Sequence, residues 1–285
     1  MENLLEIRGL CKHYPSFSLE NVGFSLPAGS IMGFIGENGA GKTTTLKLIL
    51  NEVRRDAGKI RIFGKDNIRD ELEVKKQIGV VFDESYFYEE LTAADVGKIL
   101  KRVFQTWDQP LYEKYQKDFE LPKKKKIKEY SKGMKMKLSI ASAIAHHPRL
   151  LILDEATSGL DPVVRSDILD LFLDFIQNEE CGVLFSSHIT TDLERVADYV
   201  TFLHKGRVVF SKPKDELIDR CGIVKCGASQ FSGLDKSGFL RWRRGEAECE
   251  ALVADRDEAR RKYPGLVIDN ASLDDIMLLY VKGAG

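Results

Sequence analysis

The stretch GENGAGKTT, residues 36–44, has the residue types and the spacing of a loop that binds phosphate. It fits the pattern G-x-x-x-x-G-K-[ST] and stands between a predicted strand and a predicted helix. Its glycines let the backbone turn with the N–H groups inward around a phosphate, and the helix that follows adds its positive N-terminal end. Lys42 is predicted to reach the β- and γ-phosphates of a nucleotide, and the Thr43 hydroxyl to coordinate Mg²⁺. The predicted nucleotide-binding residues of this loop are Gly36, Glu37, Asn38, Gly39, Ala40, Gly41, Lys42, Thr43 and Thr44. The alternative is an ordinary glycine turn before a helix.

The run LLILDE, residues 150–155, supplies two carboxylates. Its apolar residues predict a buried central strand, with Asp154 at the C-terminal end in position to hold a magnesium ion. Glu155 follows directly and can polarise a water against the γ-phosphate as a general base. By itself, an apolar run that ends in Asp-Glu more often has these charged residues only at the solvent-exposed end of a strand than in a catalytic role. The phosphate loop elsewhere in the chain favours the catalytic interpretation.

The elements that must position these residues alternate along the chain. Apolar runs alternate with helical patterns, which predicts an α/β sheet whose strands are buried on both faces. Strands are predicted at 30–36, 59–64 (in an antiparallel sheet), 78–82, 150–154, 182–187 and 200–210. From roughly 85 to 148 helical periods replace the β-like runs, which predicts a helical insert. The last part of the chain has short alternating pieces, a charged helix around 255–262 and a capping box of Ser272 with Asp275, and is interpreted as a small α+β appendage.

The composition is that of an ordinary globular protein and argues against a polyanionic partner. Forty-three basic residues stand against forty-four acidic ones, a net charge of −1. The lysine run KKKKIKE, 123–129, is therefore interpreted as a solvated loop, with lipid headgroups or nucleic acid as alternative partners. The five cysteines are scattered and do not have the spacing of a convincing zinc site, so reduced thiols are expected. No window approaches eighteen uncharged apolar residues, so a membrane function would need another chain to span the bilayer.

Three further motifs resemble those of an ABC-transporter ATPase over roughly residues 3–215. They are YSKGM at 130–134, ATSGLDP at 156–162 and SSH at 186–188, in the order and spacing of that family. In the family, a signature motif opens a helix and grips the γ-phosphate of ATP bound to the facing subunit. The resemblance assigns that role to Ser131 and Gly133. The other three residues of YSKGM depart from the usual Leu, Gly and Gln, which points to the ABC-2 exporter subgroup.

The resemblance assigns three more residues to the nucleotide. Asp161 resembles the aspartate that crosses the dimer interface, and His188 the switch histidine that contacts the γ-phosphate and aligns the water. Tyr14 matches the aromatic residue that stacks on adenine, with a core tyrosine as the alternative.

One departure from the family pattern concerns Asp83, which stands where the family has a glutamine. An aspartate can still coordinate Mg²⁺ through oxygen, although its side chain is shorter and charged. Beyond it, Tyr86, Phe87 and Tyr88 lie where the family docks a helix of its membrane subunit. Three adjacent aromatic residues cannot all face one way, so some of them are expected to be exposed, with core packing as the alternative.

The resemblance implies the α/β fold of a P-loop NTPase of the ABC type, with a RecA-like core, an antiparallel β subdomain and a helical subdomain. We expect an ABC ATPase domain at 1–216, with the helical subdomain at about 85–148, and a C-terminal accessory region at 217–285. The implied ligands are ATP and Mg²⁺.

The implied function is an ATP-hydrolysing subunit that powers export through a separate membrane permease. It would work at the cytoplasmic face of the plasma membrane beside a second ATP-binding subunit, identical or not, with no nucleic acid as partner. An amphipathic or antimicrobial-type peptide is the favoured cargo, ahead of lipids and drugs. The alternatives are an importer subunit and a soluble ABC protein that acts on ribosomes or DNA. The single cassette, with Asp154 only 112 positions after Lys42, disfavours the soluble class, whose members usually have two cassettes or long coiled coils.

Overall fold

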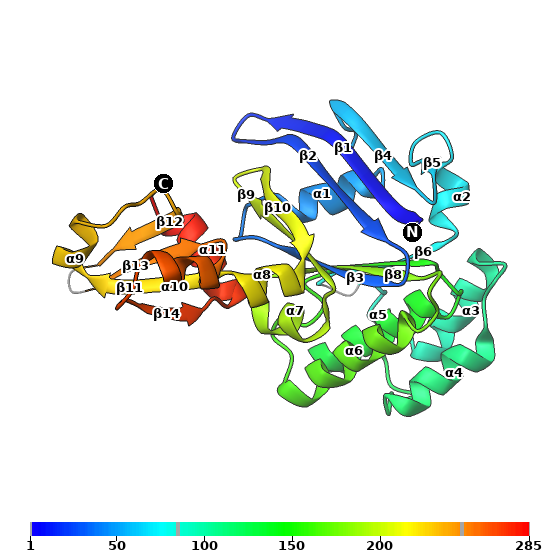
Figure 1. Cartoon of the computed structure of the whole chain (residues 1–285). Coiled ribbons are helices and arrows are strands. Elements are labelled where there is room, and N and C mark those ends of the chain that lie inside the picture. The colour runs from blue at the N-terminus through cyan, green and yellow to red at the C-terminus, as the bar shows by residue number, and fades with distance from the viewer. Residues whose placement is uncertain (1, 84–85, 246–247, 285) are drawn as a thin grey trace.

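The computed structural model describes residues 2–83, 86–245 and 248–284, and these form three sheets with helices packed on them (Figure 1). The central six-stranded sheet has the order β10-β9-β3-β8-β7-β6. Its strands pair in parallel, except that β10 runs antiparallel to β9 at one edge. The strands are β3 Ser30–Ile35, β6 Ile78–Val81, β7 Leu150–Asp154, β8 Gly182–Ser187, β9 Tyr199–His204 and β10 Arg207–Pro213.

The central strands are buried on both faces, as their unbroken apolar runs predict. Every residue of β3, β7 and β8 is buried. Successive residues point to opposite faces, so Met32 and Phe34 join one core cluster and Ile31 and Ile35 the other. The second cluster lies against three helices, α5 Lys132–Ile144, α6 Pro162–Phe175 and α7 Thr190–Val196.

The first cluster fills the space between the central sheet and an antiparallel sheet of order β2-β1-β4-β5. Figure 1 shows α1 between these two sheets. Leu46, Leu48 and Ile49 of α1 are buried there. The elements are β1 Asn3–Tyr14, β2 Phe17–Pro27, β4 Ala57–Ile62, β5 Lys65–Asp66, α1 Lys42–Ile49 and α2 Glu71–Lys75.

The helical insert stands at one side of the central sheet and has its own apolar cluster. A capping box of Thr92 and Asp95 starts its first helix, and Tyr112 donates a hydrogen bond to the Ala93 carbonyl at 2.9 Å. The lysines at 123–126 are exposed, as expected of a solvated loop. The elements are α3 Ala93–Val103, α4 Gln109–Asp118, a 3₁₀ turn Ile127–Glu129 and α5 Lys132–Ile144.

The C-terminal part adds an antiparallel sheet of order β12-β13-β11-β14. Its last helix packs on the core cluster that contains Ile31 and Ile35. Ile276 and Leu279 are buried there, and the centre of the Tyr280 ring lies 6.0 Å from that of Phe202. The capping box of Ser272 and Asp275 is confirmed. The elements are α8 Lys214–Arg220, β11 Gly222–Gly227, α9 Ala228–Ser232, β12 Phe239–Arg244, β13 Glu248–Val253, α10 Arg256–Lys262, β14 Val267–Asn270 and α11 Leu273–Lys282.

The predicted fold class is confirmed, with two differences in detail. The run 200–210 is a hairpin rather than one strand, because Lys205 and Gly206 both adopt positive φ and reverse the chain. The strands β1 and β2 were not predicted. In the part of the chain that the structure describes, no helix combines the length and the apolar character needed to cross a bilayer.

Candidate functional site

The predicted site residues lie where the central strands end. The loop 36–44 follows β3, Glu155 follows β7, His188 follows β8 and Asp83 follows β6. These strands are parallel and lie in the order β3-β8-β7-β6, so their carboxyl ends meet at one edge of the sheet. The sheet therefore brings together residues that are far apart in the sequence.

The phosphate loop has a backbone that requires glycine. Gly39 and Gly41 have φ of 81° and 110°, in the region that other residues rarely adopt. A Cβ on Gly36 would lie 2.4 Å from the Leu203 carbonyl oxygen. The loop forms one wall of an open cavity of about 670 Å³, which seven of its nine predicted residues line, all except Gly36 and Ala40.

Lys42, Glu155 and His188 form a connected group in this cavity. The Lys42 ammonium donates to the Gly36 carbonyl at 2.7 Å and lies 3.4 Å from Glu155 Oε1. The other oxygen, Oε2, lies 2.6 Å from His188 Nδ1. Glu155 has a φ of 52°, and its N–H donates to the Ser186 carbonyl at 2.9 Å. The base candidate is therefore held between a cation and an imidazole, facing the phosphate loop.

Asp154 lies behind this group and is buried. It accepts hydrogen bonds from Thr43 Oγ1 at 2.8 Å and from Ser186 Oγ at 2.9 Å. Burial raises the pKa of Asp154, and the charges of Glu155 and Asp83 raise it further against those hydrogen bonds. Carboxylate and hydroxyl oxygens are the ligands that Mg²⁺ prefers. Asp83 is exposed and lines the same cavity.

Ser131, Gly133 and Asp161 are placed differently, because none of these three residues lines this cavity. Ser131 caps α5, its hydroxyl accepting from the Met134 N–H at 3.2 Å, and Gly133 is the second residue of that helix. Asp161 caps α6, accepting from the N–H groups of the second and third residues of that helix. Ser131 and Asp161 are exposed.

Two aromatic residues of the β1–β2 hairpin, Tyr14 and Phe17, lie differently relative to this cavity. Phe17 lines the cavity, whereas Tyr14 is its partner across the β1–β2 hairpin and lies outside the lining. Tyr14 is 39% exposed, with the Lys12 ammonium 5.4 Å from its ring centre. The Phe17 ring packs so near Gly41 that a Cβ there would lie 2.7 Å from Cζ. Stacking by Tyr14 stays a prediction, and Phe17 is an aromatic residue that the sequence analysis did not select.

A polar network that the sequence did not reveal links the segments that carry Glu155 and His188. Thr157 donates to Asp192 at 2.7 Å, and the Arg165 guanidinium pairs with the same carboxylate. Thr157 belongs to the segment after Glu155, and Asp192 to α7, which begins two residues after His188. The network therefore ties together the segments that carry the two candidate catalytic side chains. Its signal in the sequence would be polar residues within otherwise apolar segments.

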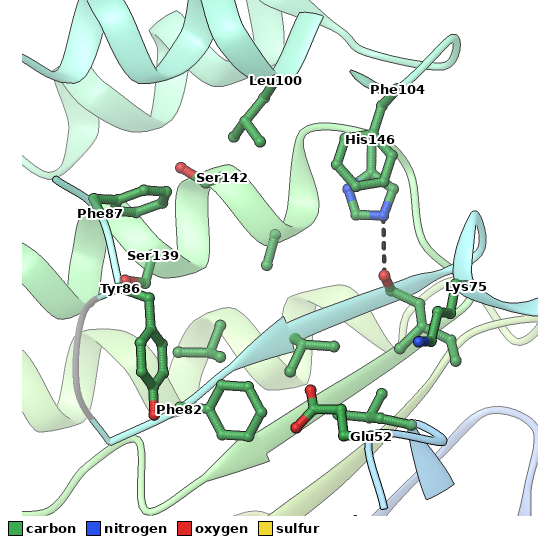
Figure 2. A pocket seen from close by; sticks show the side chains of 15 residues that line it. Glu52, Lys75, Phe82, Tyr86, Phe87, Leu100, Phe104, Ser139, Ser142 and His146 are labelled. Carbon is green, nitrogen blue, oxygen red and sulfur yellow. Dashed lines mark hydrogen bonds between the residues drawn. The ribbon is translucent and has the colours of Figure 1, made fainter. Parts of the chain in front are cut away.

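A second, apolar cavity of about 440 Å³ lies between the central sheet and the helical insert (Figure 2). Phe82, directly before Asp83, forms part of its wall, and the Tyr86 ring packs edge-on against Phe82 at 5.5 Å. On the opposite side, His146 stacks on Phe104 at 4.0 Å and approaches the Ile78 carbonyl at 3.2 Å. Burial lowers the pKa of His146, which favours the neutral form of this imidazole.

The three aromatic residues after Asp83 divide as expected. Tyr86 and Tyr88 are 74% and 83% exposed, whereas Phe87 is half-buried and packs on the cluster of the helical insert. The two residues that precede Tyr86, at 84–85, lie outside the described residues.

Comparisons with known proteins agree with this geometry. The family model described as ABC transporter matches residues 19–158. The bacitracin transport ATP-binding protein BcrA of Bacillus licheniformis is 32% identical, over 77% of this chain and 73% of its own. The lantibiotic transport ATP-binding protein SrtF of Streptococcus pyogenes is 32% identical, over 74% of this chain and 92% of its own. A solved structure described as the ATP-binding subunit of an ABC transporter is 30% identical, with a TM-score of 0.69, and the match covers 76% of this chain and 92% of that one.

Proposed function

This chain belongs to the ABC transporter family as an ATP-binding, ATP-hydrolysing subunit, and from that premise we propose that it drives peptide export through a separate membrane permease. The observation that carries the catalytic part is the meeting of Lys42, Glu155 and His188 at the sheet edge. The relatives named for bacitracin and lantibiotic transport support an antimicrobial-type peptide as cargo. Because transporter subunits act on membrane chains, we place the protein at the cytoplasmic face of the membrane.

We assign the chemistry of hydrolysis to the connected group. Lys42 would move from Glu155 to the β- and γ-phosphates, because a phosphate offers it more negative charge than one carboxylate does. Glu155 would then accept a proton from the attacking water, and His188, 2.6 Å from Glu155, would orient that water. The network of Thr157, Asp192 and Arg165 would keep both side chains in place.

The oxygen atoms around Asp154 fit Mg²⁺, and we propose that Thr43 and Asp154 hold the ion, with Asp83 as a further oxygen ligand. The Thr43 hydroxyl that now donates to Asp154 has a lone pair for the cation. The ion would neutralise charge that develops on the phosphates. A cation beside Asp154 also favours its charged form, against the burial that raises its pKa.

We propose the apolar cavity as the docking site of a permease helix. Its wall is apolar except for a few polar side chains, and Tyr86 stands exposed at its edge. Glu52 also lines it, and among the described residues this carboxylate has no ion-pair or hydrogen-bond partner. The occupant would therefore be an amphipathic helix with a basic residue opposite Glu52. Phe82 and Asp83 connect this cavity to the nucleotide, so docking and ATP binding would share one segment.

We propose that the signature residues act on the nucleotide of a second ATP-binding subunit. Ser131, Gly133 and Asp161 lie at helix N-termini outside the cavity of their own chain, where they are available to nucleotide bound by a facing subunit. Whether the facing subunit is a second copy follows from the size of the purified complex.

The experiment that tests the proposed function compares cells that express the wild-type chain with its permease against cells that express Glu155→Gln. Wild-type cells should survive a higher concentration of a bacitracin- or lantibiotic-type peptide, and Glu155→Gln cells should be as sensitive as cells without the chain. Equal survival of both strains would contradict peptide export driven by Glu155. Recovery of the chain with ribosomal proteins in place of a membrane protein would contradict the transporter assignment as a whole.

A further inference from the structure

The last helix of the accessory region, α11, is bonded to α7, the helix that follows His188. Thr190 Oγ1 donates a hydrogen bond to Asp274 Oδ1 at 2.8 Å. The Leu273 N–H donates to Glu194 Oε1, also at 2.8 Å. Each helix therefore supplies one carboxylate to the other, and both contacts lie in the first two residues of α11.

The hydrogen bond of Thr190 lies at the end of α7 that follows the candidate catalytic histidine. Thr190 is the first residue of α7, and Ile189 alone separates it from His188. His188 Nδ1 in turn lies 2.6 Å from Glu155, the proposed base. The accessory region thus contacts the chain two positions after a side chain of the nucleotide cavity.

The Thr190 hydroxyl depends on this one contact. The residue is buried, and within the described part of the chain Asp274 is the one hydrogen-bond partner of its hydroxyl. Two ion pairs join later residues of α7 to α6, and neither involves Thr190. Loss of Asp274 would therefore leave a buried hydroxyl without a partner at the start of α7, while the ion pairs with α6 remain.

Asp274 can act as a fixed acceptor because α11 is held on both sides of it. Leu273, the preceding residue, is fully buried in the core cluster that also contains Leu193 of α7. Asp275, the following residue, completes the capping box with Ser272. A carboxylate on a packed helix holds its partner in one direction more precisely than a carboxylate on a loop does.

We propose that Asp274 is a positioning residue for ATP hydrolysis, which acts through Thr190 on the orientation of His188. This rests on the role of His188 in the proposed function. The accessory region would then contribute to the rate of hydrolysis from outside the site. No described residue of this region lines the nucleotide cavity, so ATP binding should not depend on the contact.

The first test measures ATP hydrolysis and ATP affinity of the full-length chain. Asp274→Ala should lower kcat about fivefold, as for one lost hydrogen bond, and leave KM and ATP affinity unchanged. Asp274→Asn should restore most of the rate, because its amide oxygen can still accept from Thr190. The matched control is Asp257→Ala. Asp257 is the second residue of α10, as Asp274 is of α11, and it pairs with Arg260 of its own helix, so this variant should keep all three values.

A second variant removes the same hydrogen bond from its other partner. Thr190→Val keeps the shape of the buried side chain and should lower kcat as much as Asp274→Ala does. The chain with both changes should lose no more than either single variant, because the bond can be lost only once. Thermal unfolding of each variant shows whether a lower rate comes from a smaller folded fraction.

The readout that a merely structural role would not move is the NMR signal of the His188 ring. The chain has five histidines, and the signal that His188→Ala removes is that of His188. Asp274→Ala and Thr190→Val should shift this signal, whereas Asp257→Ala should leave it in place. In a His188→Ala chain, Asp274→Ala should lower hydrolysis no further.

The outcomes separate this inference from the proposed function. A folded Asp274→Ala chain with wild-type kcat, or with an unchanged His188 signal, would overturn the inference. A further fivefold loss when His188 is already alanine would overturn it too, because Asp274 would then act by another route. Should Asp274→Ala not fold, the same criteria apply to Thr190→Val. If His188→Ala alone hydrolyses ATP at the wild-type rate, the role of His188 in the proposed function fails instead.

Discussion

The two cavities on either side of Asp83 are built in opposite ways. The nucleotide cavity is lined by charges and backbone, and its main side chains already have partners: Lys42 and His188 both contact Glu155. The other cavity is lined mostly by apolar side chains, with Tyr86 exposed at its edge. In the nucleotide cavity, charged side chains can leave their present partners to bind a charged ligand. The apolar cavity is stabilised only when the apolar surface of a partner covers it.

Because the cavities differ in this way, mutations can separate ATP binding and hydrolysis from docking of the permease. Changes in the charged cavity should alter ATP binding and hydrolysis in the isolated chain. Changes in the apolar cavity should leave those activities intact and act only when the permease is present.

The largest effect is expected from Glu155→Gln. The amide keeps the size of the side chain but cannot accept the proton of the attacking water, so hydrolysis should fall by about 10²–10⁴-fold while ATP still binds. Phosphate release and equilibrium binding on the same preparation measure the two quantities. Near-normal turnover would remove Glu155 from the role of base.

Lys42→Met should weaken ATP binding about 100-fold, because the chain loses a charged hydrogen-bond donor to the phosphates. Lys47→Met is the matched control, since Lys47 lies on the same helix and is exposed. Titration with a fluorescent nucleotide checks both variants. A similar loss in the two would indicate a general effect of charge rather than a contact of Lys42.

Thr43→Val should have a smaller effect, confined to the metal. Valine keeps the shape of threonine and removes the hydroxyl that contacts Asp154, so affinity for ATP with Mg²⁺ should fall about 10-fold. With EDTA in place of Mg²⁺, the variant and the wild type should bind ATP alike. A defect of the same size in EDTA would contradict a role of Thr43 in holding the ion.

The same contrast explains what the sequence could predict. The charged cavity depends on contiguous motifs. A loop of fixed spacing, or a buried run that ends in Asp-Glu, shows from the sequence alone where its residues lie in the fold. The run before Asp154 became β7 and the loop 36–44 a strand-to-helix turn, as predicted. The choice between Tyr14 and Phe17 was not predictable, because the two are cross-strand neighbours and spacing along the chain does not say which reaches the cavity.

The apolar cavity could not be predicted, because residues from distant segments line it. Leu50, Phe82, Phe104 and His146 meet only after the sheet and the helical insert have packed. The strand β1 was missed for a different reason: its pairing with both neighbours is irregular near Gly9, which has a φ of 60°. Such bulges break the alternation on which strand prediction depends.

The measurement that tests the separation most directly compares Tyr86→Ala with Tyr88→Ala. Both side chains are exposed, but of the two only Tyr86 lines the apolar cavity. ATP hydrolysis is measured for the isolated chain and after reconstitution in liposomes with the membrane protein that co-purifies with it. Tyr86→Ala should keep the hydrolysis rate of the isolated chain and lose about fivefold of the permease-stimulated rate, while Tyr88→Ala keeps both. If Tyr86→Ala lowers both rates equally, or keeps full stimulation, the apolar cavity is not the separate docking site proposed here.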